Sequence, residues 1–487
     1  MRGGRRAEDG SAAHELAATR EAADPVRGRD RPVTARELVP AVGGDHAVPA
    51  PDPIARAYVL LALRLDQHSP GLVDAYFGPR DLKAQVDMET LASPSRLAAE
   101  ASALQARGSC DVDEPDRRRW LLRQLVALET HASRLTGAAI PYVVEVTRYL
   151  DAAPQRMAAA TSAEVRRDLE NLLPGPGSLA ERLAEWDARF VVPPDRVRGV
   201  VDVLVPAIRE ASMARFPAPE GESIRVNLVT GHPWSGYNWY DGGLRSRVDL
   251  NLDLPIRPAA LVDVLAHETY PGHHLEHAWK ERHLVHDLGR VEATVLLLNA
   301  PECYVSEGLA DLGASFTLDA GARAGVLRAA CRAAGLPASD DDVTRQVAIQ
   351  SNLRRLRGAD GTAALMLHAD GRPRDEVEAF LQEEALMSPE RAAKRLEFIT
   401  HPLSRAYVFC YAGGEALLRD WCGSAGASDA ERAGDVQPAG AAAPANNGVA
   451  AAAAMSGEPA RARFLRLLTE QLTPSGIAAE LAGVPAA

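Results

Sequence analysis

The chain has 487 residues, 46% of them hydrophobic, and a formal net charge of −12 at pH 7. A chain of this length can bury a large core, in two or three ordinary domains or in one two-lobed domain. The negative charge argues against nucleic acid or an anionic membrane as a partner, and no apolar run approaches the roughly 18 residues of a membrane-spanning helix. The five cysteines form no C-x-x-C pair, which favours a reducing cytoplasm over a disulfide framework.

The first half of the chain is expected to be a disordered tail followed by helices. Residues 1–50 are rich in Ala, Arg, Gly, Asp and Pro and hold no apolar segment typical of a signal peptide. From Ile54 onwards apolar residues recur at helical spacing, and prolines separate the segments. This half shows no constellation of catalytic residues. The pattern predicts helices over 90–107, 115–136, 140–153, 155–171 and 177–190.

Two short segments then alternate between apolar and polar residues, as strands do. They cover 223–229 and 246–252, and we expect an antiparallel pair joined by the long loop 231–243. Such a loop either packs on a core or lines a pocket, and the sequence leaves both interpretations open. Its aromatic residues are Trp234, Tyr237, Trp239 and Tyr240.

The stretch from His267 to His274 reads His-Glu-Thr-Tyr-Pro-Gly-His-His and follows an apolar run that predicts a buried helix. A histidine followed directly by a glutamate suggests a zinc ligand beside a general base. In metallopeptidases with His-Glu-x-x-His, the second histidine comes four residues after the first. Here that position is Pro271, so a second ligand must come from further along the chain.

A regular helix cannot supply that second ligand. His273 lies a rise of roughly 9 Å beyond His267, and His274 about 10 Å beyond it, whereas zinc–ligand bonds are about 2 Å long. Pro271 removes a backbone donor and Gly272 tolerates unusual dihedral angles. A kink at these two residues could bring one of the later histidines back beside the first.

The other interpretation of this region is a histidine-rich, solvated helix. Charged residues surround the later histidines, which predicts a polar face there, whereas the buried apolar run favours the metal site for the first histidine. The histidines assigned to the polar face are His277, His283 and His286.

A third ligand is available forty residues after the first. The small and apolar residues of 304–314 predict a closely packed helix that contains Glu307 and Asp311, four residues apart on one face. Two carboxylates on so apolar a helix are costly unless a cation or hydrogen-bond donors offset them. A metal bound by Glu307, with Asp311 orienting a ligand histidine, would do so. The alternative is that this face is exposed.

The rest of the chain returns to helices over 320–400 and then reaches a low-complexity stretch at 423–458, which we expect to be a disordered insertion. A last helix is expected over 459–472. The predicted organisation is a tail (1–50), an N-terminal helical lobe (51–220), a catalytic region (221–422), the insertion (423–458), and a C-terminal helix and tail (459–487).

These motifs together resemble a bacterial family known as domain of unknown function 885. The resemblance rests on His-Glu-x-x-Pro-Gly-His-His and the downstream Ser-Glu-Gly-Leu-Ala-Asp, and it extends from about Ile54 to about Pro474. Members of the family are regarded as zincin-like metallopeptidases of mainly helical fold. Weaker marks are 73–79, 237–240, 245–248 and Tyr411-x-x-Gly414.

The resemblance implies one zinc ion per chain, bound by His267, His273 and Glu307, with Glu268 as the general base. His274 remains an alternative to His273. The resemblance also implies a mainly helical, zincin-like fold. Together with the antiparallel pair expected from the alternating segments, the predicted class is mainly α (α+β), with a small antiparallel sheet beside the metal-binding helix.

Substrate contacts are expected from three places in the sequence. In zincins a strand edge beside the metal helix pairs with the substrate backbone, which makes 245–252 the candidate strand. The developing oxyanion needs a donor, for which Tyr411 is the first choice, although it could equally be a packing residue. The expected substrate-binding residues are Tyr237, Arg245, Arg247, His401 and Arg405.

The function that these residues predict is a zinc metallopeptidase acting on small peptides in the cytoplasm. A non-peptide amide hydrolase would use the same metal site. A non-haem iron oxygenase also uses two histidines and a carboxylate, and metal identity and dioxygen dependence would separate it. A non-catalytic helical metal-binding protein, or a decayed peptidase, would instead have a closed site with a fourth protein ligand.

Overall fold

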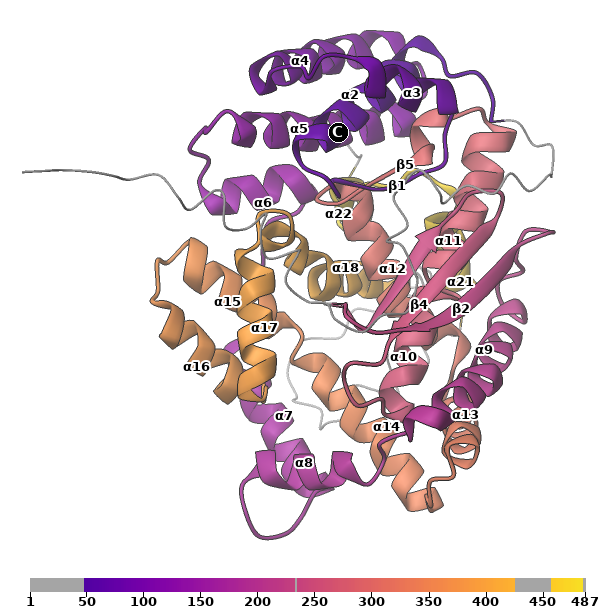
Figure 1. The fold of residues 1–487 in the computed structure, drawn as a ribbon, viewed down its shortest axis with the longest axis vertical. Helices are drawn as coiled ribbons and strands as arrows, with labels where there is room; N and C mark the ends of the chain where they lie inside the picture. The colour runs from indigo at the N-terminus through magenta and orange to yellow at the C-terminus, as the bar shows by residue number, and fades with distance from the viewer. Residues whose placement is uncertain (1–47, 233, 425–456, 485–487) are drawn as a thin grey trace, which may run out of the picture. The chain divides into compact units, whose positions relative to one another are not determined.

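The structure is a computed structural model that describes residues 48–232, 234–424 and 457–484. The predicted tail 1–50 and insertion 423–458 lie almost wholly outside the described residues. The described part of the chain is mainly helical with two small sheets (Figure 1), which confirms the predicted α+β class. None of the described helices combines the length and hydrophobicity needed to cross a bilayer.

The first half of the described chain is a series of helices, most of which begin at a proline or a capping side chain. Asp52 and Ser93, for example, accept hydrogen bonds from the first backbone N–H groups of their helices. The predicted helices of this half are confirmed with shifted ends. In chain order the helices are α2 (Pro53–His68), α3 (Arg80–Met88), α4 (Pro94–Asp111), α5 (Pro115–Leu135), α6 (Tyr142–Leu150), α7 (Ala159–Leu172), α8 (Leu179–Ala188) and α9 (Val197–Met213).

The second half adds the helices that surround the candidate site. The predicted helices over 320–400 and near the C-terminus are confirmed, and α22 follows them without having been predicted. In chain order the helices are α10 (Pro258–Glu268), α11 (His273–Lys280), α12 (Pro301–Thr317), α13 (Ala320–Ala334), α14 (Asp340–Arg355), α15 (Gly358–His368), α16 (Arg374–Glu384), α17 (Pro389–Thr400), α18 (Ser404–Ser424), α21 (Glu458–Thr469) and α22 (Pro474–Leu481).

Helix α12 is shared between the two large apolar cores. Its Tyr304 packs with residues of α2 to α6 and α15 to α18 in the first core. Its Val305 and Leu309 pack with residues of α9, α10, α18 and α21 in the second. Because apolar neighbours cover α12 on all sides, any acidic side chain that it carries is enclosed, and Glu307 and Asp311 are each only 5% exposed.

Two glycines let α12 and α18 pack with their backbones in contact. A Cβ on Gly308 would lie 2.5 Å from the carbonyl carbon of Gly414, and a Cβ on Gly414 would lie 2.4 Å from the carbonyl oxygen of Tyr304. No side chain fits at either position without separating the helices. The close crossing holds the aromatic residues of α18 against the acidic residues of α12.

The three-stranded sheet corrects the predicted strand pairing. Strand β2 (Ser223–Val229) runs parallel to β4 (Arg245–Asn251), and β3 (Gly236–Tyr240) pairs with β4 in antiparallel register. The sheet order is β2-β4-β3, so the segment predicted as a long loop contains a strand. Gly242 and Gly243, with φ of 73° and 64°, form the tight turn between β3 and β4. Because β3 occupies one edge of β4 in this hairpin, β2 pairs with the opposite edge of β4.

The position of β4 excludes it as the substrate strand. Both of its edges are already paired, so the predicted role of 245–252 is wrong. Within the described sheet β2 and β3 each keep an unpaired outer edge, and of these two strands β3 is the one that packs against α10. A second, two-stranded sheet pairs β1 (Val73–Tyr76) with β5 (Val295–Leu297).

Candidate metal centre

The helix is interrupted between α10 and α11, in a turn that contains the two residues where a kink was predicted, Pro271 and Gly272. Helix α10 ends at Glu268, and α11 starts at His273 after a turn in which Gly272 N–H donates to the Ala266 carbonyl oxygen at 3.2 Å. A Cβ on Gly272 would lie only 1.9 Å from the carbonyl oxygen of His267. The turn therefore requires glycine, and it folds α11 back so that the first residue of α11 lies beside the end of α10.

Three ligand-type side chains converge at this turn. His267 Nε2 and His273 Nε2 are 3.1 Å apart. The Glu307 carboxylate lies 3.3 Å from the first nitrogen, through Oε2, and 3.4 Å from the second, through Oε1. Tetrahedral zinc with bonds of about 2.0–2.1 Å would hold its ligand atoms roughly 3.3 Å apart. The spacing of the three side chains is therefore the spacing that a shared metal requires.

A carboxylate also lies behind each of the two histidines. Asp311 Oδ1 lies 3.2 Å from His267 Nδ1 and accepts a hydrogen bond from Arg357. Ser306 Oγ lies 3.2 Å from His273 Nδ1 and donates to Glu276 at 2.5 Å. Protons held on the Nδ1 atoms leave both Nε2 lone pairs directed at the same point.

His274 points away from this centre. Its ring is fully buried, with Nδ1 2.8 Å from Ser246 Oγ and Nε2 2.8 Å from Glu222 Oε2. Both nitrogens are used, so His274 connects α11 to β4 and to the segment before β2. The structure thus brings His273, and not His274, to His267.

The charges at the centre shift the pKa values of the histidines upwards. Burial alone would lower the pKa of His267, but hydrogen bonds with Asp311 and Glu307 outweigh it and raise the pKa to about 9. Burial is likewise outweighed at His273, where Glu307 and Glu276 raise the pKa well above its usual range. In the absence of a cation, the carboxylates therefore retain protons on this histidine pair.

Glu268 lies beside the two histidines of the centre. Potential ligand atoms of His267, Glu268 and His273 lie within 4.8 Å of one another. Glu268 is buried, with only 8% of the residue exposed, and burial raises the pKa of its carboxyl group. A carboxylate that is close to the centre and has a raised pKa is a candidate for proton transfer.

A second group of possible ligands overlaps with the first. His273, Glu276 and His277 also have ligand atoms within 4.8 Å of one another. Here, however, Glu276 already accepts from Lys280 Nζ at 2.7 Å and from Ser306. Because the Lys280 ammonium already neutralises this carboxylate, a second metal ion is disfavoured there. We therefore assign Glu276 and His277 to supporting the His267–His273 centre.

The predicted polar face of α11 is partly wrong. Glu276, Lys280 and Glu281 are buried, and Lys280 Nζ lies between Glu276 and Glu302, 2.9 Å from the latter. His283 remains at the surface beside Asp287. The charged residues that follow the motif therefore compensate one another inside the protein.

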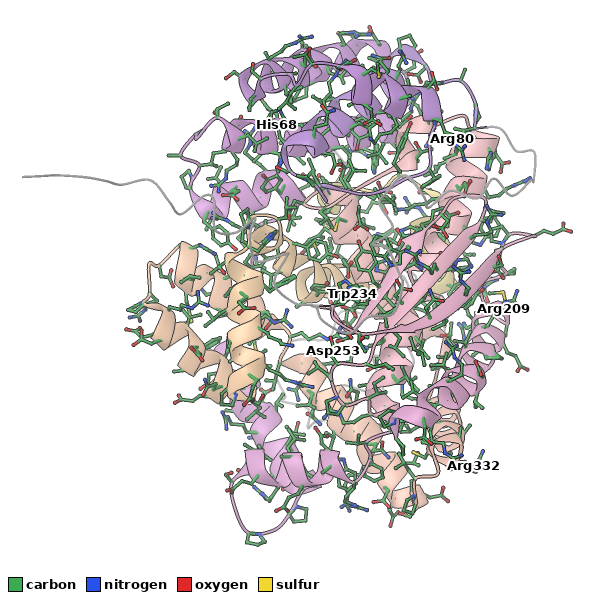
Figure 2. All side chains as sticks on the ribbon, in the orientation of Figure 1. His68, Arg80, Arg209, Trp234, Asp253 and Arg332 are labelled. Atoms are coloured by element: carbon green, nitrogen blue, oxygen red, sulfur yellow. The ribbon has the colours of Figure 1, made fainter. Side chains whose placement is uncertain are left out.

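A cavity of about 240 Å³ opens onto the centre. Tyr237, from β3, lies in its wall and donates a hydrogen bond to Asp74 of β1. On α18, Tyr407 Oη donates to Glu307 Oε1 at 2.5 Å, and the Tyr411 ring centroid lies 6.5 Å from that of His267. Trp234, labelled in Figure 2, lies at the β3 side of the cavity, and Leu296, Leu297, Leu298, Phe398 and Leu403 form an apolar wall.

Four of the predicted substrate-binding residues do not line this cavity. Arg247 stacks over Trp239, and Arg405 pairs with Glu145 at 2.9 Å. Arg245 lies on the central strand, and His401 caps the end of α17 at the surface. Their places in the sequence, close to motif residues, gave no information about the direction of the side chains.

Sequence reasoning also missed several residues of the centre. Asp74 belongs to the segment 73–79, which was noted as a weak mark of the family. Its place at the centre becomes apparent only from the pairing of β1 with β5. Glu276 follows the second histidine by three residues, a spacing that places the two side chains on one helix face. Ser306 directly precedes Glu307, and Tyr407 lies one turn before Tyr411. Helical periodicity could have suggested Glu276 and Tyr407, but neither Ser306 nor Asp74.

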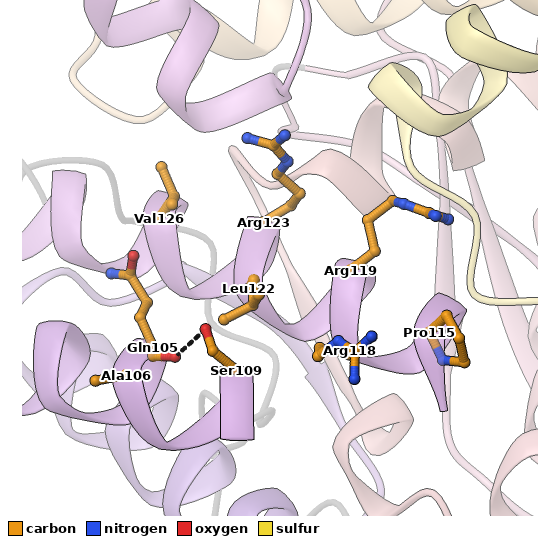
Figure 3. Close-up of a pocket in the computed structure, with 9 residues that line it drawn as sticks. All are labelled: Gln105, Ala106, Ser109, Pro115, Arg118, Arg119, Leu122, Arg123 and Val126. Carbon is orange, nitrogen blue, oxygen red and sulfur yellow. Dashed lines mark hydrogen bonds between the residues drawn. The ribbon is translucent and has the colours of Figure 1, made fainter. Parts of the chain in front are cut away.

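A larger hollow of about 520 Å³ lies between α4 and α5 (Figure 3). Its arginines are engaged: Arg118 donates to the Val112 carbonyl oxygen, Arg119 pairs with Asp116, and Arg123 pairs with Asp151. Neither histidine nor carboxylate lines it. The smaller cavity at His267 is therefore the candidate site.

Comparisons with known proteins add little to this description. The sequence matches no protein-family model and no curated protein. A protein of Colwellia psychrerythraea described as a lipoprotein is 13% identical, with 81% of this chain and 67% of that chain covered and a TM-score of 0.47. A Shewanella oneidensis protein described as a lipoprotein of unknown function is 12% identical, with 79% and 78% covered and a TM-score of 0.41. Likeness at this level carries no conclusion.

Proposed function

We propose that the chain is a zinc-dependent hydrolase, specifically a metallopeptidase of the cytoplasm that cleaves small peptides. The observation that carries the proposal is the convergence of His267 Nε2, His273 Nε2 and Glu307 within 3.1–3.4 Å of one another. Two histidines and one glutamate are a ligand set of catalytic zinc sites, in which a fourth position stays open for water or substrate. Each chain would bind one zinc ion.

The side chains at this point fit a cation. Glu307 Oε2 is buried and faces the candidate ligand atom His267 Nε2 at 3.3 Å without a well-formed hydrogen bond, so a cation between the two atoms would satisfy both. The backing of each histidine by a carboxylate is typical of zinc sites. When bound, zinc would supply a Lewis acid that polarises the scissile carbonyl and favours deprotonation of the attacking water.

The residues around the ligands have separate tasks in the proposed reaction. Glu268 accepts a proton from the attacking water and donates it to the leaving amine. Tyr411, whose pKa burial raises well above its ordinary value, stays protonated and can donate a hydrogen bond to the developing oxyanion. Tyr407 holds the Glu307 carboxylate in place.

The free edge of β3 is suited to bind the substrate backbone. Ser235 and Asp241 form backbone hydrogen bonds with Asn251 and Arg245 of β4. Because bonding alternates along an antiparallel strand, the backbone groups of Gly236 and Asn238 point away from β4. Gly236 lies so close to the base that a Cβ there would be 3.2 Å from Glu268 Cγ. An extended peptide paired with this edge would pass the base.

Metal content tests the proposal directly. Plasma mass spectrometry of the purified protein should find about one zinc per chain, as a catalytic site of this kind holds. His267→Ala and His273→Ala should lose it. His274→Ala is the matched control and should keep it, because His274 binds Ser246 and Glu222 instead. Iron in place of zinc would favour an oxygenase, and a protein that takes up no metal after reconstitution would contradict the site.

Zinc binding should release protons even at a pH above the ordinary pKa of histidine. With the pKa of His267 at about 9, the histidine pair retains at least one proton at pH 7.5. An ordinary histidine would be only roughly one-tenth protonated there. The metal must displace that proton, so affinity should rise with pH until about pH 9. Titration calorimetry in buffers of different ionisation enthalpy should find at least one proton released per zinc. A value near zero would contradict this charge state.

A further inference from the structure

We propose that the cavity binds a cationic group of the substrate at Asp74, next to the amide that is cleaved. The group is a free α-ammonium or the side chain of Lys or Arg. The inference rests on the proposed hydrolase function and adds the class of substrate to it.

The first observation is the charge of the cavity wall. Five carboxylates line it, and neither Lys nor Arg does. Three of the five have cationic or metal-type partners: Glu307 faces the two histidines, and Glu276 and Glu302 share Lys280. Asp74 forms no ion pair within the described residues, and its one hydrogen bond comes from the neutral hydroxyl of Tyr237. A partly buried carboxylate left in this state favours a cation that arrives with the ligand.

The second observation is an unsatisfied acceptor in the same wall. Asn238 is 8% exposed and donates through Nδ2 to the carbonyl oxygen of Glu268 at 2.7 Å. That bond fixes the amide, and Oδ1 has no hydrogen-bond partner. A buried acceptor without a donor is costly, and an N–H group of a ligand would satisfy it. Asn238 lines the same cavity as Asp74 of β1 and Tyr237 of β3.

The third observation is the proximity of Asp74 to the metal ligands. Asp74, His273 and Glu307 line the same cavity of about 240 Å³. In an amino-terminal residue the ammonium nitrogen is about 2.5 Å from the carbonyl carbon, so a recognition site for it must lie next to the metal. A substrate carboxylate placed at Asp74 would meet like charge, which argues against recognition of a free carboxyl terminus at that residue.

The test uses the zinc-loaded full chain and three peptides of one length. The first is Leu-Ala-Ala-amide with a free amino group, the second is its N-acetyl form, and the third is the acetylated peptide with Lys in place of Leu. We expect kcat/KM for at least one cationic peptide to exceed that for the neutral peptide by roughly 100-fold. Preference for the first identifies an α-ammonium, and preference for the third a basic side chain. Equal rates for all three would overturn the inference and leave the hydrolase in place.

Substitution of Asp74 provides the residue-level control. Asp74→Asn keeps the acceptor for Tyr237 and removes the charge, so it should reduce the preference for the cationic peptide to within about fivefold. Asp87→Asn, in an exposed ion pair with Lys83, should leave the preference unchanged. Zinc content should stay the same in both variants. A preference that survives Asp74→Asn would overturn the assignment.

A binding measurement separates this inference from the proposed reaction. Zinc-loaded Glu268→Gln protein is titrated by calorimetry with the same three peptides, so no turnover is needed. Tighter binding of a cationic peptide, lost on adding Asp74→Asn, supports the subsite even if no peptide is cleaved. Equal binding of all three overturns it.

Discussion

The Glu268→Gln protein should bind zinc as the wild type does and lose between about 10²- and 10⁴-fold in kcat. Glutamine has nearly the same shape as glutamate and fills the same buried position against Gly236, but it cannot accept a proton from water. KM should change less than kcat, because the side chain acts mainly in the transition state. Peptide turnover and zinc content, measured on the same preparation, check both parts of this expectation.

A matched control removes the same charge elsewhere. Glu397→Gln, at an exposed position of α17, should change neither metal content nor rate. Near-normal turnover of Glu268→Gln would mean that another group is the base. Loss of zinc would mean that Glu268 holds the centre together, in which case its role in proton transfer would have to be abandoned.

The metal-ligand candidates were predictable because their signals are local in sequence. A run of apolar residues ending at His267 predicts a buried helix, and proline followed by glycine predicts its break. Glu307 and Asp311 stand out as acids in a helix of small residues. Each of these expectations follows from spacing along one element. None of them requires knowledge of which elements become neighbours.

The strand pairing was not predictable in the same way. Alternation identified β2 and β4 as strands, but it carries no information about which strand lies between them. β3 was hidden in a segment rich in glycine and aromatic residues, although the Gly242-Gly243 dipeptide before β4 is a hairpin signal. Asp74 reaches the centre only through the pairing of β1 with β5, across more than two hundred residues of sequence.

Charged side chains after the motif show a different limit. Glu276 and Lys280 are four residues apart, a spacing equally suited to an exposed ion pair and to a buried one. What decides between them is Glu302 on α12, which approaches Lys280 from another element. The sequence around the motif therefore could not distinguish a solvated face from a buried network that supports His273.

The Gly272→Ala protein should lose zinc affinity by roughly 100-fold or more, with the helices of the fold retained. The new Cβ would lie 1.9 Å from the carbonyl oxygen of His267 and 2.6 Å from that of Ala266. Backbone atoms on both sides cannot rotate out of the way as a flexible side chain would, so the turn must open. Opening it moves His273 away from His267, and mutation of groups that merely orient metal ligands already costs 10–100-fold.

Competition with a chelator of known affinity measures this loss, and circular dichroism measures the retained helix. Gly325→Ala is the matched control, because a Cβ at Gly325 meets nothing within 4 Å on α13 and alanine favours a helix. It should bind zinc normally. If Gly272→Ala also bound zinc with wild-type affinity, the two histidines would not depend on this turn for their approach. The ligand set would then have to form by a different path of the chain between α10 and α11.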